Sequence, residues 1–140
     1  MSRTRRLLAI LLVLLFLAPL ARIGGASAGE RCAPRHSVKS VSCFTGVASW
    51  YGRKYQGRKT ASGEPFDRND LTAAHPFLPM QSKALVTNLA TGRSVTVRIN
   101  DRGPGQGRAI DLSQAAARSL GIEARGLAKV RIEEIAEGTE

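Results

Sequence analysis

The sequence predicts a mainly β protein, a compact β-barrel with one short helix. Apolar and polar residues alternate over 94–99 and again over 128–133, as they do in strands that bury one face. One segment, 113–120, combines helical spacing with start and stop signals. Fourteen glycines punctuate the 140 residues and keep the elements short, which is typical of a small barrel.

The clearest strand is predicted over Ser94 to Ile99. Its apolar side chains fall on one face and its polar ones on the other, with Val95, Val97 and Ile99 opposite Ser94, Thr96 and Arg98. Another strand is predicted just before it, around Leu85, Thr87 and Leu89. The segment between them has the length and glycine position of a hairpin loop, Ala90-Thr91-Gly92-Arg93.

The helix is predicted over Ser113 to Leu120. Ser113 is a favourable N-cap residue, alanines follow it, and Gly121 supplies the stop. Apolar residues recur along it at four-residue spacing, at Leu112, Ala116 and Leu120. A closing strand follows, in which Ala128, Val130 and Ile132 alternate with Lys129, Arg131 and Glu133.

The first 28 residues are interpreted as a secretory signal peptide. An apolar run from Leu7 to Leu20 follows three arginines, and a signal peptidase site fits Ala26-Ser27-Ala28. The run is shorter than the roughly 20 residues that cross a bilayer. We therefore expect export by the Sec or twin-arginine route to the periplasm, the cell envelope or the medium, with no stable membrane insertion after cleavage. The alternative is a buried core helix.

Net charge narrows the choice of partners. The formal charge of +10 falls to +6 without the four arginines of the signal, because 17 Lys and Arg then face 11 Asp and Glu. These cations are scattered and accompany no nucleic-acid-binding motif, so no nucleic acid partner is expected. An exported protein with this positive charge would meet an anionic partner such as cell-wall glycan or an acidic membrane face. The alternative is that the charges only keep the domain soluble.

Two cysteines, Cys32 and Cys43, precede the predicted domain. In an oxidising compartment they are expected to form a local disulfide. The two thiols and two distant histidines, His36 and His75, match no familiar zinc-ligand spacing, so no metal or other cofactor is predicted. A lipid on Cys32 is the other alternative, but charged residues stand before it where a lipidated cysteine needs small ones.

The folded body is predicted to be one domain, residues 46–135, which is long enough for one core. Residues 29–45 are interpreted as a poorly ordered linker that contains both cysteines, and residues 136–140 as a frayed tail. The protein is expected to be a monomer.

Four motifs in this body occur in the order seen in one known family. They are Gly46-Val47-Ala48-Ser49-Trp50-Tyr51-Gly52, Gly57-Arg58-Lys59-Thr60-Ala61-Ser62-Gly63-Glu64, Leu71-Thr72-Ala73-Ala74-His75 and Asn100-Asp101-Arg102-Gly103-Pro104. By these motifs the chain resembles the rare lipoprotein A (RlpA-like) family over residues 46–135. The resemblance implies a six-stranded double-psi β-barrel, related to expansin and barwin-like domains. It also implies a lytic transglycosylase that cuts peptidoglycan glycan strands stripped of stem peptides.

Three features depart from the family pattern. No lipobox is present, so lipoprotein anchoring is not expected. The chain ends at Glu140 without the glycan-binding SPOR domain that many relatives carry, so septal recruitment through that domain is not expected. Gly105-Gln106-Gly107 follows Pro104 where relatives tend to have a bulkier residue and a slightly longer loop, which alters one wall of the expected groove.

The polar loop from Asn100 to Ser113 lies between two apolar segments and is the expected site. It contains two carboxylates, of which Asp111 is interpreted as structural because apolar residues flank it next to the helix. Splitting a glycosidic bond needs a proton donor at the leaving oxygen. In a lytic transglycosylase the sugar's own 6-hydroxyl then attacks and forms a 1,6-anhydro ring, so one carboxyl can serve first as acid and later as base.

Three residues match the family's proposed catalytic positions: Asp101, Glu64 and His75. We predict that Asp101 is the general acid and base, provided that neither Arg102 nor Arg108 pairs with it. The alternative for Asp101 is a structural salt bridge or a turn cap. The alternative for Glu64 is a solvated turn residue. The alternative for His75 is a packed or hydrogen-bonding residue.

Substrate-binding residues are predicted beside these three. Trp50 and Tyr51 end the first strand, and exposed aromatic faces of this kind stack on sugar rings. The alternative for Trp50 is a place in the core, and the alternative for the basic residues near it is a solvated loop. The other predicted binding residues carry a charge or an amide: Arg58, Lys59, Asn100, Arg102 and Arg108.

Two function classes follow. The first is a lytic transglycosylase acting on peptidoglycan, and the presence of Glu64, His75 and Asp101 together favours it. The second is a non-catalytic, expansin-like module that binds peptidoglycan or another polysaccharide, which the altered loop at 105–107 leaves open. A basic secreted protein without sugar specificity is a third class that only the net charge supports.

Overall fold

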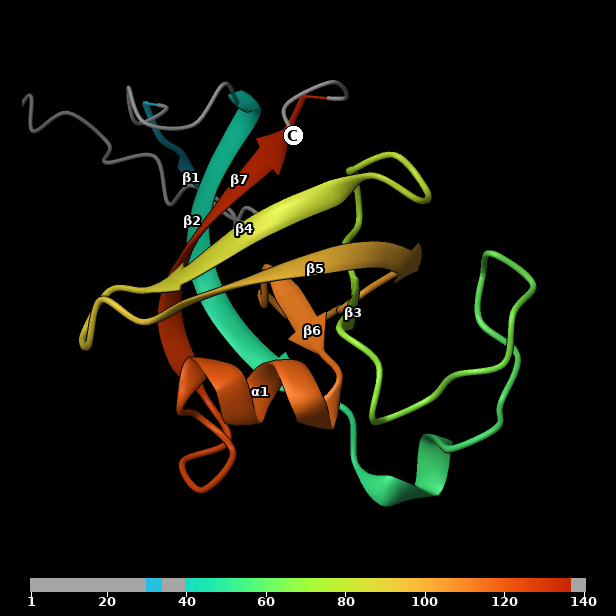
Figure 1. The fold of residues 1–140 in the computed structure, drawn as a ribbon. Helices are drawn as coiled ribbons and strands as arrows, with labels where there is room; N and C mark the ends of the chain where they lie inside the picture. Colours follow the sequence, from blue (N-terminus) through green and yellow to red (C-terminus); the bar gives the residue numbers. More distant parts are fainter. Residues whose placement is uncertain (1–29, 34–39, 137–140) are drawn as a thin grey trace, which may run out of the picture.

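The computed structural model describes residues 30–33 and 40–136 (Figure 1). The predicted signal peptide lies outside the described residues, as do positions 137–140 of the predicted tail. Within the described part, no helix is long and apolar enough to cross a membrane.

The described chain forms one sheet that closes on itself. Its elements are β1 (Glu30–Arg31), β2 (Ser40–Trp50), the 3-10 turn η1 (Arg53–Tyr55), β3 (Thr72–Ala74), β4 (Lys83–Asn88), β5 (Ser94–Asp101), β6 (Ile110–Leu112), α1 (Gln114–Leu120) and β7 (Ala128–Ile135). The strand order is β1-β2-β6-β3-β5-β4-β7, and β7 pairs back onto β2. Strands β2 to β7 therefore close a barrel, and the two-residue β1 extends one edge of β2. The predicted six-stranded barrel with one helix is confirmed.

The pairing around β3 brings two acidic positions close together. Ala74 is the register partner of Asp101 in β5, where the strands run parallel, and of Asp111 in β6, where they run antiparallel. Asp101 and Asp111 thus stand on the two strands that flank β3, with roughly 10 Å between their backbones. The end of β5 and the loop that leads into β6 contribute to the cavity described below.

The core lies inside the barrel, with α1 across one end of it (Figure 1). The alternation predicted for β5 is confirmed, because Val95, Val97 and Ile99 are all buried. Helix α1 begins and ends as predicted. The Ser113 hydroxyl accepts the Ala116 N–H, and Gly121 adopts a φ of 76°, a left-handed conformation that favours glycine.

Strand β2 starts earlier than the sequence predicted. It begins at Ser40, and β1 lies further upstream, so the interpretation of residues 29–45 as a poorly ordered linker is wrong for 30–31 and 40–45. Positions 29 and 34–39 of that segment lie outside the described residues. The cause is barrel closure, since this stretch pairs with β7 in the register Phe44↔Ile132. Phe44 also packs against the core. Local composition gave no sign of this pairing, because the partner strand lies at the other end of the chain.

Two other strands bury residues that their alternation did not indicate. The β4–β5 hairpin forms as predicted, but Ala84 and Val86 are the inward residues of β4, and Leu89 is 47% exposed. In β7, Glu133 is fully buried although it belongs to the polar half of the pattern. Its carboxylate lies 3.9 Å from the guanidinium of Arg131, which also donates to the Ala33 carbonyl at 3.0 Å.

Cys32 and Cys43 form a disulfide, as predicted, so neither thiol is available for zinc or a lipid. Cys43 lies within β2 and is buried. The Cys32 N–H also donates to the Cys43 carbonyl at 3.1 Å. The bridge therefore fastens the segment around β1 to the edge of the barrel.

Reduction of this disulfide is expected to release the segment at 30–33 while the barrel stays folded. Closure of so short a loop contributes at most about 3 kcal/mol to the free energy of unfolding, and the six barrel strands do not depend on β1 for closure. Urea unfolding with and without reductant measures the loss, and amide exchange at Cys32 reports the release. Collapse of the β-sheet circular dichroism signal on reduction at 25 °C would contradict this expectation.

Candidate active site

A cavity of about 360 Å³ opens where the ends of β5 and β2 meet the loops around them. Its lining residues come from three segments, which lie within 51–66, 101–105 and 108–111. The lining residues are Tyr51, Tyr55, Arg58, Lys59, Thr60, Phe66, Asp101, Arg102, Gly103, Pro104, Gly105, Arg108 and Asp111. Five of the predicted site residues other than Asp101 are among them: Tyr51, Arg58, Lys59, Arg102 and Arg108.

Asp101, the predicted general acid, ends β5 and lines this cavity. Its Oδ1 accepts two backbone N–H groups, from Ala61 at 2.9 Å and from Arg102 at 2.8 Å. Its Oδ2 accepts the Tyr51 hydroxyl at 3.2 Å. Because two N–H groups already occupy Oδ1, Oδ2 is the oxygen left to carry a proton.

The two arginines that could have paired with Asp101 bind other groups. Arg102 donates from Nη1 to two backbone carbonyl oxygens of the loop after β3, at 3.0 and 2.8 Å. Arg108 donates to the Ser49 hydroxyl at 2.8 Å and lies 3.5 Å from the Asp111 carboxylate. Neither guanidinium group therefore pairs with Asp101, which is what a role as general acid requires.

Aromatic side chains form one wall of the cavity. The Tyr51 ring meets the rings of Tyr55 and Phe66 edge to face, with centroids 5.4 and 5.0 Å apart. Burial, together with the negative charges of Asp101 and Asp111, raises the pKa of Tyr51. The phenol therefore stays protonated at physiological pH and remains a hydrogen-bond donor to Asp101.

Asp111 is the second carboxylate of the described lining. It accepts the Ser49 hydroxyl and pairs with Arg108. These donors belong to β2 and to the loop before β6, so Asp111 joins two parts of the site wall. Among residues 30–33 and 40–136, no three His, Cys, Asp or Glu side chains lie close enough together to hold a metal ion.

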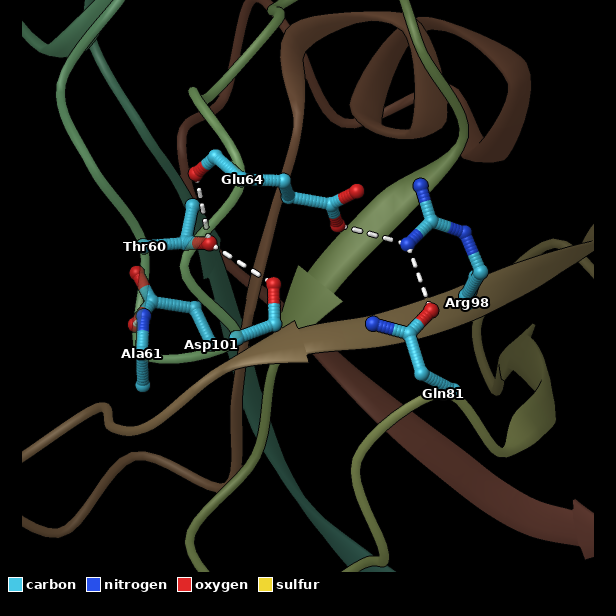
Figure 2. Close-up of polar contacts among 7 residues, drawn as sticks. Thr60, Ala61, Glu64, Gln81, Arg98 and Asp101 are labelled. Carbon is cyan, nitrogen blue, oxygen red and sulfur yellow. Dashed lines mark hydrogen bonds and ion pairs between the residues drawn. The ribbon is translucent and has the colours of Figure 1, made fainter.

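Glu64 lies outside the cavity lining. Figure 2 shows its carboxylate pointing to Arg98 and not to Asp101, and the Arg98 guanidinium also binds Gln81. The Glu64–Arg98 distance is 2.6 Å. The hydrogen bond from Arg98, aided by one from Asn100, lowers the pKa of Glu64. An ionised carboxylate that is held in this way is a poor proton donor.

The backbone of Glu64 nevertheless shapes the site. The Thr60 hydroxyl donates to the Glu64 carbonyl at 2.8 Å (Figure 2). The Thr60 N–H donates to the same oxygen at 2.9 Å. The Ser62 N–H donates to a β5 carbonyl at 3.1 Å. This turn presents the Ala61 N–H to Asp101. Glu64 therefore helps to hold Asp101 in position through its backbone, and its carboxylate does not point into the cavity.

His75 is fully buried and does not line the cavity. Its Nδ1 accepts the backbone N–H groups of Phe77 and Leu78, at 3.1 and 3.0 Å. The ring contacts those of Phe44 and Phe77. Burial, with a smaller effect of the Arg102 charge, lowers the pKa of His75 to about 4. The carbonyls of His75 and Leu78 are the ones that bind Arg102, so His75 holds the loop that keeps this guanidinium away from the acid.

Two predicted substrate-binding residues are absent from the lining. Trp50 packs against the core, which was the alternative considered for it. Asn100 is only 3% exposed. Tyr55, which follows Tyr51 closely in the sequence, does line the cavity. Phe66 was not predicted as a site residue. It is a lone aromatic in a polar loop without periodicity, so only its contact with Tyr51 reveals the role.

A family model described as lytic transglycolase matches residues 43–132. The chain belongs to this family. The double-psi β-barrel and the RlpA-like membership, both predicted from four short motifs, are thereby confirmed. The match begins at Cys43, so it includes positions 43–45 of the segment that had been interpreted as a linker.

Curated relatives carry the name endolytic peptidoglycan transglycosylase RlpA. One from Neisseria meningitidis serogroup A is 51% identical over 112 residues, which cover 79% of this chain and 46% of the relative. Another from Pasteurella multocida is 56% identical over 89 residues, which cover 63% of this chain and 30% of the relative. The chain thus spans less than half the length of these curated relatives.

Solved structures share the fold at low sequence identity. The Streptomyces papain inhibitor has a TM-score of 0.57 and 24% identity, over 71% of this chain and 99% of the inhibitor. An expansin from Clavibacter michiganensis has a TM-score of 0.55 and 22% identity, over 70% of this chain and 52% of the expansin. At these identities the likeness shows the fold alone.

Proposed function

We propose that this protein is a lytic transglycosylase that cleaves peptidoglycan glycan strands without stem peptides and leaves 1,6-anhydromuramyl ends. The observation that carries the proposal is the Asp101 carboxylate, which two backbone N–H groups hold in the cavity wall while Arg102 and Arg108 bind elsewhere. The activity in the names of the curated relatives supports the same reaction.

Asp101 performs two proton transfers in this reaction. In the first, Oδ2–H gives its proton to the glycosidic oxygen as the bond from C1 to that oxygen breaks. In the second, the 6-hydroxyl of the same sugar attacks C1, and the Asp101 carboxylate takes the hydroxyl proton. The acid returns to its starting state, and no water is consumed.

Tyr51 assists the first transfer. As Oδ2 loses its proton, the carboxylate gains negative charge and the hydrogen bond from the neutral Tyr51 phenol strengthens. The two N–H groups at Oδ1 act on the same charge and are already in place before the reaction. This stabilisation is greater in the transition state than in the ground state, which is the condition for catalysis.

We further propose that the protein acts as a monomer outside the cytoplasm, in the periplasm or cell envelope or beyond it. The N-terminal signal pattern, the disulfide and the basic charge support this location.

The test uses purified sacculi that an amidase has first stripped of stem peptides. The protein is expected to release soluble fragments ending in 1,6-anhydromuramic acid, which mass spectrometry distinguishes from hydrolysis products by the loss of one water. Untreated sacculi serve as the comparison and should yield less. Pelleting with sacculi without any anhydro product would favour the non-catalytic, expansin-like module instead.

A further inference from the structure

The cavity carries more positive than negative charge. Its described lining contains four cationic side chains and two carboxylates. Two of the cations, Arg102 and Arg108, have partners within the protein. The other two, Arg58 and Lys59, are exposed and form no ion pair with any carboxylate of the described chain. Two uncompensated positive charges therefore face solvent beside the candidate acid.

Arg58 has a defined position relative to Asp101. Its guanidinium lies over the Tyr55 ring, 5.6 Å from the centroid. Tyr55 contacts Tyr51 edge to face, and the Tyr51 hydroxyl binds Asp101. The backbone of Arg58 is held as well, since its N–H donates to the Tyr55 carbonyl at 3.0 Å and its carbonyl accepts the Phe66 N–H at 2.8 Å. This series of contacts holds the Arg58 guanidinium in a defined position relative to the Asp101 carboxylate.

Lys59 follows on the same strand-like segment. It forms an isolated β-bridge with Pro65, on the far side of the turn that presents Ala61 to Asp101. Lys59 and Arg58 thus lead directly into the turn whose Ala61 N–H binds Asp101. A ligand held by these two cations has a limited choice of positions over the acid.

The glycan of peptidoglycan offers a matching charge. Its sugars alternate between N-acetylglucosamine, which is neutral, and N-acetylmuramic acid, which has a lactyl group. When the stem peptide is present, the lactyl carboxyl is an uncharged amide. When the peptide has been removed, that carboxylate is free and negative, so one charge recurs on every second sugar.

We propose that Arg58 and Lys59 bind the free lactyl carboxylate of a stripped muramyl residue. This inference rests on the proposed function and deepens it in two ways. The carboxylate explains why stripped strands are preferred, because an amide at that position cannot form the ion pair. It also sets the register of cleavage. Since the charge occurs on alternate sugars, its capture brings one of the two kinds of glycosidic bond to Asp101 and excludes the other.

The experiment measures binding without turnover, in an Asp101→Asn background. Three oligosaccharides of equal length are compared: stripped muramyl glycan, the same glycan with its carboxyl groups reduced to alcohols, and chitin. The protein with Arg58 and Lys59 intact is expected to bind the carboxylate form about fivefold more tightly than the reduced form at low salt. The combined change Arg58→Gln and Lys59→Gln is expected to remove this preference and leave chitin binding unchanged.

Lys129→Gln is the matched control, because Lys129 is an exposed cation on β7 outside the cavity lining. It should keep the full preference for the carboxylate form. The inference is overturned if the double variant keeps the preference, if Lys129→Gln removes it equally, or if the parent binds none of the muramyl glycans. If the protein prefers the carboxylate form but releases no anhydro products from sacculi, only the proposed function is wrong. The carboxylate-binding site would then still be supported.

Discussion

Asp101→Asn is expected to lower the release of 1,6-anhydromuramyl products by about 10³-fold, within the range that a general acid and base contributes. The variant should fold, because the amide oxygen still accepts the N–H groups of Ala61 and Arg102. Its NH₂ group can donate to the Tyr51 oxygen in place of the hydrogen bond that Oδ2 accepts. Product release is followed by mass spectrometry, folding by circular dichroism and binding by pelleting with sacculi.

Asp70→Asn is the control for this variant, since Asp70 is an exposed acid outside the cavity lining. It should retain full activity. Glu64→Gln should retain much more activity than Asp101→Asn, because Glu64 points to Arg98 and away from the acid. Wild-type turnover by Asp101→Asn, with loss in Glu64→Gln or Asp111→Asn, would assign the proton transfer to one of those carboxyls and leave Asp101 structural.

His75→Phe is expected to reduce the free energy of unfolding by about 2–3 kcal/mol, the cost of leaving buried donors unsatisfied. Phenylalanine fills the space between the neighbouring rings but removes the acceptor for the N–H groups of Phe77 and Leu78. His75→Asn is the matched comparison, because its Oδ1 occupies the position of Nδ1 and can accept these bonds. Urea unfolding at pH 7 should therefore find His75→Asn more stable than His75→Phe. The reverse order would contradict the acceptor role of His75.

The stability of the wild-type protein is also expected to depend on His75 through pH. Its pKa is about 4 in the folded protein against an ordinary value of 6.5. Between these values the unfolded chain binds a proton that the folded protein does not bind, so stability is full above about pH 6.5 and falls as the pH drops towards 4. The loss is about 3 kcal/mol when complete. Urea unfolding from pH 7 to pH 4 measures it, and His75→Asn should show a shallower decline. Identical declines in the two proteins would refute the link to His75.

The sequence by itself determined the features that rest on local patterns. The alternation in β5 placed Val95, Val97 and Ile99 inside, and the cap residues Ser113 and Gly121 bounded α1. The hairpin between β4 and β5 followed from a glycine at the right place in a short loop. Each of these depends on residues within a few positions of one another, where side-chain period and backbone preference decide the outcome. Asp101 was also identified in this way, at the point where an apolar strand gives way to a polar loop.

Only the tertiary structure decided the direction and environment of the polar side chains. Arg102 is next to Asp101 in sequence, yet its guanidinium binds the loop after β3. Glu64 and His75 belong to motifs shared with the family, but one binds Arg98 and the other is buried beneath the site. These outcomes depend on which strands meet when the barrel closes, and barrel closure joins segments tens of residues apart in the sequence. The pattern of apolar and polar residues along the chain determines which segments form strands or a helix. Burial, charge and hydrogen bonding between distant segments determine which side chains can bind substrate or transfer a proton.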